Sequence, residues 1–256
     1  MKQNDSWALI LGGSSGLGLA TAVKLAASGF HICIVHRDRK ANLPDFETKC
    51  EAMRKNDVLV KTFNASALKP ETLDSVIHEL PEEKVSVLVH SIAKGSLKTL
   101  TENDSNALSL EDINLTLHAM ATSWYEWAKA LKQANRFAGD VRNMAFTSEG
   151  NQKVWPGYGA VSAAKVTLEA LMRQMAVEWA CQGIRTNCVQ AGTTETPSFK
   201  MIPGSEQLAE AAAKRNPFNR LTTPEDVANA VWLLCQPEAK WINGTILKVD
   251  GGESLR

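Results

Sequence analysis

The segment Trp7-Ala-Leu-Ile-Leu11-Gly12-Gly-Ser-Ser-Gly16-Leu-Gly18 decides the fold, because it joins an apolar run to a glycine-rich turn that opens a helical pattern. Trp7–Leu11 is a short continuous apolar run, which is typical of a strand buried on both faces. Glycines permit a tight turn and let a phosphate group approach the backbone N–H groups at the start of the helix. Such a turn alone can be purely structural, so its meaning depends on the segments around it.

The rest of the chain repeats this alternation of short apolar runs and longer helical patterns. The predicted strands are Trp7–Leu11, His31–Val35, Val58–Thr62, Val85–His90, Arg142–Thr147, Ile184–Gln190 and Thr245–Val249. The predicted helices span about 16–28, 39–55, 69–80, 109–134, 157–181 and 224–235. This pattern predicts an α/β fold with a single doubly wound parallel sheet of Rossmann type, about seven strands with helices on both faces. We expect one domain over residues 1–256.

One irregular stretch, at about 192–223, interrupts the alternation and contains a short helix near 205–215. A connection of this length in a compact domain is more often functional than a spacer. It follows a strand end, where open α/β sheets bind ligands. We therefore predict that it forms a substrate-binding lid.

The composition is that of an ordinary globular protein, with 44% hydrophobic residues, 22% charged residues and a formal net charge of zero. It gives no sign of a nucleic-acid or membrane partner, since no apolar run approaches the ~20 residues of a membrane helix. Met1–Ser6 leads directly into the first predicted strand, which leaves no room for a signal peptide. The five cysteines contain no Cys-x-x-Cys pair, which favours reduced thiols and a cytoplasmic location. No cluster has metal-ligand spacing, so no metal is expected.

The residues after the second predicted strand indicate which dinucleotide the fold prefers. A carboxylate at this point usually binds the ribose 2′-hydroxyl of NAD, whereas an arginine accommodates the 2′-phosphate of NADP. Arg37, Arg39 and Lys40 form a cationic cluster that suits the phosphate, although Asp38 lies among them. NADPH is therefore favoured over NADH. The alternative is that these charged residues are only a solvated helix N-terminus.

Tyr158 and Lys165 are seven residues apart in a predicted helix, which is nearly two turns, so their side chains are expected on one face. A phenol on such a face can polarise a carbonyl oxygen, and a nearby ammonium would lower the phenol's pKa from its usual ~10. The alternative for this pair is a packed tyrosine and a surface lysine.

These motifs together resemble the short-chain dehydrogenase/reductase family over essentially the whole chain. The turn has the family spacing Gly-x3-Gly-x-Gly, and Val249-Asp-Gly-Gly252 resembles its closing motif. The resemblance implies a catalytic set of Tyr158, Lys165, Ser148 and Asn114, the last in a water-linked proton relay. It also implies cofactor contacts at Gly12, Ser14, Ser15, Gly16, Leu17, Gly18, Arg37, Asn64, Ala65, Ser91, Ile92, Ala93, Lys165, Thr194 and Thr196.

Two departures from ordinary members resemble the enoyl-acyl-carrier-protein reductases. His90-Ser-Ile-Ala93 replaces the usual Asn-Asn-Ala-Gly, and the tyrosine precedes the lysine by seven residues instead of four, with Val161 at the ordinary position. Ser148 lies where many of these reductases have a second tyrosine. A divergent, NADPH-preferring bacterial branch lacks that second tyrosine, and this chain resembles it.

The resemblance implies NADPH-dependent reduction of trans-2-enoyl thioesters in fatty acid elongation, with a substrate carried on acyl carrier protein. It also implies a homotetramer, or a dimer, through the 109–134 and 157–181 helices. Two alternatives remain: another short-chain oxidoreductase that acts on a ketone or alcohol, and a catalytically silent NADP-binding regulator.

The predicted lid offers apolar candidates for an acyl pocket and basic candidates for a rim facing an acidic carrier protein. For the apolar candidates, packing into the helical core is the alternative. They are Phe199, Met201, Ile202, Leu208 and Phe218 for the pocket, and Lys200, Lys214, Arg215 and Arg220 for the rim, with Glu206 and Glu210 opposing the rim.

Overall fold

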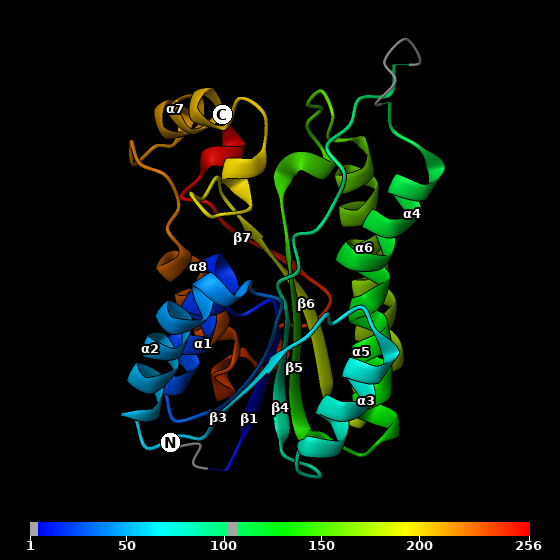
Figure 1. Cartoon of the computed structure of the whole chain (residues 1–256), viewed down its shortest axis with the longest axis vertical. Helices are drawn as coiled ribbons and strands as arrows, with labels where there is room; N and C mark the ends of the chain where they lie inside the picture. Colours follow the sequence, from blue (N-terminus) through cyan, green and yellow to red (C-terminus); the bar gives the residue numbers. More distant parts are fainter. Residues whose placement is uncertain (1–4, 102–106) are drawn as a thin grey trace.

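A computed structural model describes residues 5–101 and 107–256 and shows seven parallel strands in one sheet (Figure 1). The strand order is β3-β2-β1-β4-β5-β6-β7. The strands are β1 (Trp7–Leu11), β2 (His31–His36), β3 (Val60–Asn64), β4 (Val85–His90), β5 (Phe137–Thr147), β6 (Ile184–Ala191) and β7 (Ile246–Val249). The predicted doubly wound α/β fold is thereby confirmed, and the order reverses between β1 and β4, where such sheets bind ligands.

Helices cover both faces of the sheet, as the continuous apolar strands require. On one face lie α1 (Gly16–Ala27), α2 (Leu43–Arg54) and α8 (Pro224–Leu234), and on the other lie α3 (Pro70–Glu79), α4 (Leu110–Leu117), α5 (Ser123–Gln133) and α6 (Gly159–Glu178) (Figure 1). Each face has its own hydrophobic core. Trp124 and Trp127 on α5 are fully buried in one of these cores, so both belong to the packing of the fold.

The predicted 109–134 helix is interrupted, since α4 and α5 are separated by a π-helical segment, His118–Thr122. At this interruption the Ser123 hydroxyl donates to the carbonyl oxygen of Ala119 and contacts Nε2 of His90 at 3.0 Å. A side-chain hydrogen bond to the preceding turn competes with the regular helical ladder. Because His90 lies on β4, the sequence of the helix alone does not reveal the interruption.

Two arrangements were expected for the apolar residues of the lid, an acyl pocket or packing into the helical core, and the structure does not show the second. The lid helix α7 (Ser205–Arg215) follows a short 3₁₀ turn, Phe199–Met201, and matches the predicted 205–215 helix. None of the five apolar candidates of the lid is buried, and Met201 and Phe218 are about three-quarters exposed. Packing into the helical core therefore does not explain them. Over the described part of the chain, no helix has both the length and the apolar character needed to cross a membrane.

Candidate active site

The candidate residues gather at the carboxyl ends of the strands, where parallel sheets bind ligands. Gly12 follows β1 and pairs through its N–H with the carbonyl oxygen of Val35 at 2.8 Å, while Ser91 follows β4 and pairs with that of Leu11 at 2.8 Å. Arg37, Asn64, Ser148 and Thr194 also lie at or just beyond the ends of their strands, β2, β3, β5 and β6. These predicted cofactor and catalytic residues thus share one edge of the sheet.

The glycines of the first turn are required by close contacts. Gly12 has a φ of +85°, and a Cβ there would lie 2.5 Å from the carbonyl oxygen of Ser91. A Cβ on Gly18 would lie 2.3 Å from the carbonyl oxygen of Gly12 and 2.9 Å from Oγ of Ser91. Such distances are too short for any side chain. The turn and the end of β4 therefore pack backbone to backbone.

The start of α1 is open to an anion. Its N-cap, Ser15, makes no side-chain capping hydrogen bond, so the first N–H groups of the helix keep their capacity for a phosphate. Thr196 lies over this turn, because a Cβ on Gly16 would meet its methyl carbon at 3.1 Å. The turn, Ser91 and Thr196 thus fit the pyrophosphate of a dinucleotide. Ser14, Leu17, Ile92 and Ala93 lie in the same two segments.

The adenosine end of the predicted cofactor site lies at β2 and β3. Arg37 is exposed, whereas the amide of Asn64 binds the backbone of Asp38 on both sides, accepting from its N–H at 2.9 Å and donating to its carbonyl oxygen at 3.2 Å. Ala65 follows directly. An open pocket of about 480 Å³ lies beside this turn, away from Tyr158, and His36 and Asn64 line it together with residues of α2.

Tyr158 is the N-cap of α6, one residue before the helix, and its carbonyl oxygen accepts the first helical hydrogen bond from Ser162 at 2.8 Å. Its ring packs against Trp155, edge to face with centroids 5.6 Å apart, and against Gly150, where a Cβ would lie 2.3 Å from the ring. Burial raises the pKa of Tyr158 above its usual value. The expectation of a lowered pKa was wrong, because desolvation outweighs the opposing effect of the Ser148 hydroxyl.

Lys165 is buried, with only 7% of its surface exposed, so it is not a surface lysine. Its Nζ donates to the carbonyl oxygen of Phe146 in β5 at 2.7 Å. Burial lowers the pKa of Lys165 to about 8, although its neighbours Cys188 and Glu169 oppose this change. Its ammonium is therefore anchored to the strand that precedes Ser148 and is poised to lose its proton at mildly alkaline pH.

Ser148 lies beside Tyr158, and its hydroxyl lowers the pKa of that phenol enough to offset part of the burial effect. Its Oγ is nevertheless buried without a hydrogen bond of good geometry to any described residue. An unsatisfied buried hydroxyl is costly, and at a ligand-binding edge it is suited to a substrate oxygen.

Asn114 is exposed on α4, and no described hydrogen bond joins its side chain to Tyr158 or Lys165. The relay through water, in which the resemblance places Asn114, stays a prediction.

Two buried residues near Lys165 were missed at the level of sequence. Glu169 accepts from Thr147 and from Asn151, both at 2.6 Å, and so fixes the loop after β5. Its position four residues after Lys165 on α6 was the available signal. His90 is buried, and desolvation, followed by the charge of Lys165, lowers its pKa to about 3. It is therefore neutral at physiological pH.

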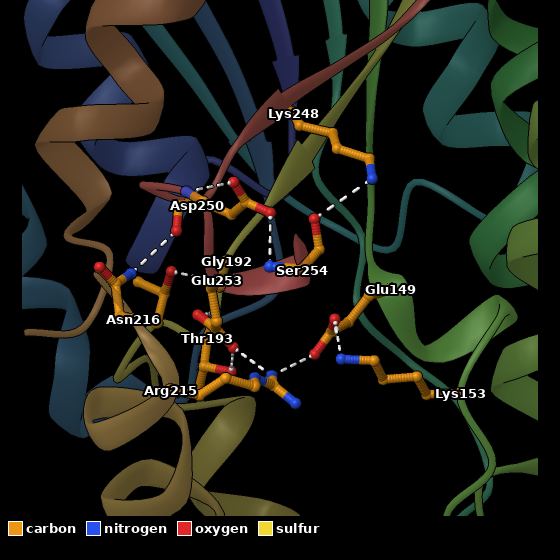
Figure 2. Close-up of polar contacts among 12 residues, drawn as sticks. Glu149, Lys153, Gly192, Thr193, Arg215, Asn216, Lys248, Asp250, Glu253 and Ser254 are labelled. Carbon is orange, nitrogen blue, oxygen red and sulfur yellow. Dashed lines mark hydrogen bonds and ion pairs between the residues drawn. The ribbon is translucent and has the colours of Figure 1, made fainter. Parts of the chain in front are cut away.

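Ion pairs connect the loop after β5 to α7 and the end of the chain (Figure 2). Arg215 lies between Glu149 and Glu253, contacting Glu253 at 2.6 Å, and Glu149 also contacts Lys153 at 2.8 Å. Glu253 is 1% exposed and accepts from the backbone N–H of Thr193 at 3.0 Å. We call Lys153, Glu149, Arg215 and Glu253 the bridge.

The bridge changes the interpretation of the predicted basic rim. Arg215 is committed to two carboxylates, and Arg220 pairs with Asp226 through both of its terminal nitrogens. Only Lys200 and Lys214 of the four cations make no ion pair with a described residue. Among the residues that the structure describes, no group of three or more His, Cys, Asp or Glu is arranged to hold a metal.

Comparison with known proteins identifies the family. The family model described as enoyl-(acyl carrier protein) reductase matches residues 12–254. A probable 2,4-dienoyl-CoA reductase of Bacillus subtilis is 30% identical, over 96% of both chains. An NADPH-dependent aldehyde reductase-like chloroplastic protein of Arabidopsis thaliana is 28% identical, over 96% of this chain and 93% of the relative.

Among solved structures, the enoyl-[acyl-carrier-protein] reductase (NADH) of Aquifex aeolicus VF5 superposes with a TM-score of 0.83 at 22% identity, covering 100% of this chain and 99% of that one. The family match spans nearly the whole chain and includes the glycine turn and the Tyr158–Lys165 pair. The chain therefore belongs to the short-chain dehydrogenase/reductase family, as an oxidoreductase that resembles the enoyl-(acyl carrier protein) reductases.

Proposed function

We propose that this protein reduces trans-2-enoyl thioesters with NADPH. The observation that carries the proposal is the position of the phenol. Tyr158 lies at the start of α6, and its raised pKa keeps the phenol protonated. Val161 occupies the position of the ketone-reducing tyrosine in ordinary members. It is 5% exposed and packs among apolar side chains. The matching family model is described by the same reaction class.

The chemistry follows from what each side chain can do at neutral pH. When bound, the dihydronicotinamide supplies a hydride to the β-carbon of the enoyl thioester. Negative charge then develops on the thioester oxygen, and the protonated phenol of Tyr158 donates a hydrogen bond to it. Donors of this kind act only where charge develops, so they lower the barrier rather than merely bind substrate.

Lys165 supplies positive charge to the same edge of the sheet. Its ammonium is held at the carbonyl oxygen of Phe146, in a buried position where charge is poorly screened. In this proposal it binds the nicotinamide ribose hydroxyls and favours the enolate. In this proposal the proton for the α-carbon comes from Tyr158 or from a water chain through Asn114 and Lys165.

A second candidate function is the reduction of a ketone or aldehyde. It is favoured by Ser148, whose buried and unpartnered hydroxyl lies beside Tyr158 and could share a carbonyl oxygen with it. The similarity to an aldehyde reductase-like protein supports the same candidate.

The discriminating experiment follows NADPH oxidation with crotonyl thioester and, in parallel, with acetoacetyl thioester. We expect turnover of crotonyl thioester and little of acetoacetyl thioester. The reverse result would overturn the proposal in favour of ketone reduction. Binding of NADPH without turnover of either would indicate a silent regulator. Repeating each assay with NADH, and with coenzyme A in place of acyl carrier protein, defines the cofactor and the carrier.

We further propose that the enzyme acts in fatty acid biosynthesis in the cytoplasm, as a homotetramer or a dimer. The exposed apolar residues Leu115 on α4 and Val166 and Val177 on α6 support an assembly through these helices. Sedimentation of the purified protein would test it. A carrier-protein surface has less support, because two cations of the predicted rim are already paired.

The pKa of Lys165 predicts the pH dependence of the free enzyme. Lysine is charged below its pKa, so a pKa of about 8 means that the ammonium is lost as pH rises through that value. Tyr158, whose pKa is raised, stays protonated in this range. We expect kcat/KM for NADPH to be flat below pH ~7 and to fall towards tenfold per pH unit above ~8. Lys165→Met should show low activity without this limb. A falling limb that persists in that variant would assign it to another group.

A further inference from the structure

Asp38 is the residue after β2 that disagrees with a preference for NADPH, and the structure shows what restrains it. Its Oδ2 lies 2.8 Å from Nδ1 of His36, two residues earlier in the chain. The side chain of His36 is 2% exposed and that of Asp38 is 19% exposed. The carboxylate is therefore turned back towards the protein and bound to a buried ring.

Both members of this contact are fixed from other directions. The ring of His36 packs against Phe46 of α2, with centroids 4.5 Å apart. The backbone of Asp38 is held on both sides by the amide of Asn64, at 2.9 Å and 3.2 Å. Because the ring and the backbone are both held, the orientation of the carboxylate is determined by the single hydrogen bond to His36.

The neighbouring cations have no such partner. Arg37, Arg39 and Lys40 are exposed, and none of them forms an ion pair with a carboxylate of a described residue. A carboxylate at the end of the second strand binds a ribose 2′-hydroxyl and repels a 2′-phosphate, whereas an arginine attracts the phosphate. The cofactor preference therefore depends on whether the carboxylate or the arginine faces the ribose.

We propose that His36 sets the cofactor preference of this enzyme, by holding the carboxylate of Asp38 away from the ribose 2′ position and leaving that position to Arg37. His36 is thus a positioning residue that acts through Asp38. The inference deepens the proposed function, since it rests on the preference for NADPH, but it concerns cofactor binding alone and requires no particular substrate.

The test measures the affinities for NADP⁺ and NAD⁺ by titration calorimetry, without any substrate. His36→Phe keeps an aromatic ring against Phe46 but removes the nitrogen that binds Asp38. We expect it to lower the ratio of NADP⁺ to NAD⁺ affinity about tenfold or more, equivalent to ~1.4 kcal/mol. The loss should be in NADP⁺ affinity, because the released carboxylate would face the phosphate.

Two further variants separate this role from a structural one. His36→Asn presents an amide N–H to Asp38 and should keep the wild-type ratio, as rescue by a conservative substitution. The double variant His36→Phe with Asp38→Asn should recover the ratio, because the released side chain then carries no charge. A wild-type ratio in His36→Phe, or the same low ratio in the double variant, would overturn the proposal.

The result is independent of the reaction. Failure of crotonyl thioester reduction would overturn the proposed function and leave these affinities unchanged. If His36→Phe unfolds, two other variants still decide. A tenfold lower ratio of NADP⁺ to NAD⁺ affinity in His36→Asn, which keeps an N–H donor, would contradict a role for the His36 contact with the carboxylate. The same low ratio in Asp38→Asn alone would contradict it as well.

Discussion

Replacing Tyr158 with Phe should lower kcat for crotonyl thioester reduction by ~10²–10³ and leave the affinity for NADPH unchanged. Phe retains the ring that packs against Trp155 and Gly150, so the start of α6 should keep its structure. Only the phenolic O–H is lost. Because its pKa is raised by burial, this group is protonated over the working pH range and is a hydrogen-bond donor in every molecule.

The measurement combines steady-state kinetics with NADPH titration on the same preparation. Tyr125 is the other tyrosine of the chain and provides a matched control, since it stacks on Trp179 with centroids 6.0 Å apart in the layer of α5. Tyr125→Phe should retain wild-type activity. Wild-type turnover in Tyr158→Phe would exclude the phenol as the group that stabilises the enolate.

Replacing Gly18 with Ala should weaken NADPH binding ~10–100-fold, since overpacking costs ~1–3 kcal/mol. The new methyl group would lie 2.3 Å from the carbonyl oxygen of Gly12 and 2.9 Å from Oγ of Ser91. One of these neighbours is backbone in the turn itself, so relief requires the turn to move. The turn that fits the pyrophosphate would then lose its shape.

Gly139→Ala in β5 is the matched control, because a Cβ there would have no neighbouring atom within 4 Å. Both variants should be compared by NADPH titration and by thermal unfolding. We expect Gly139→Ala to resemble the wild type in both. Unchanged NADPH affinity in a folded Gly18→Ala variant would show that the turn does not bind the cofactor.

The sequence predicts the frame of the fold well, because parallel strands buried on both faces leave a continuous apolar signal. β1 and β4 match their predicted bounds. β5 starts at Phe137, five residues earlier than the predicted Arg142, because Gly139 and Asp140 interrupt its apolar pattern. Strand pairing with β4 and β6 extends the strand through residues that would not indicate one alone.

The candidate site is predicted less completely, because its electrostatics depend on distant contacts. The pair Tyr158 and Lys165 is visible as a spacing, but the degree of burial that shifts their pKa values in opposite directions is not. The restraint on Asp38 requires the position of Asn64 on another strand. Local patterns thus identify which residues lie at the site, while tertiary contacts determine their charge and orientation.

The bridge also has a consequence for when the protein completes its folding during synthesis on the ribosome. Glu149 belongs to the middle of the chain, but Arg215, which contacts it, and Glu253, which contacts Arg215, are synthesised much later. A domain generally folds as a unit, so its structure is completed only after its last contacting residues have emerged. The phosphate-binding turn also has a late neighbour, because Thr196, which lies over it, is synthesised after Ser148. A nascent enzyme would therefore complete both its dinucleotide site and the ion pairs behind Ser148 only late in its synthesis.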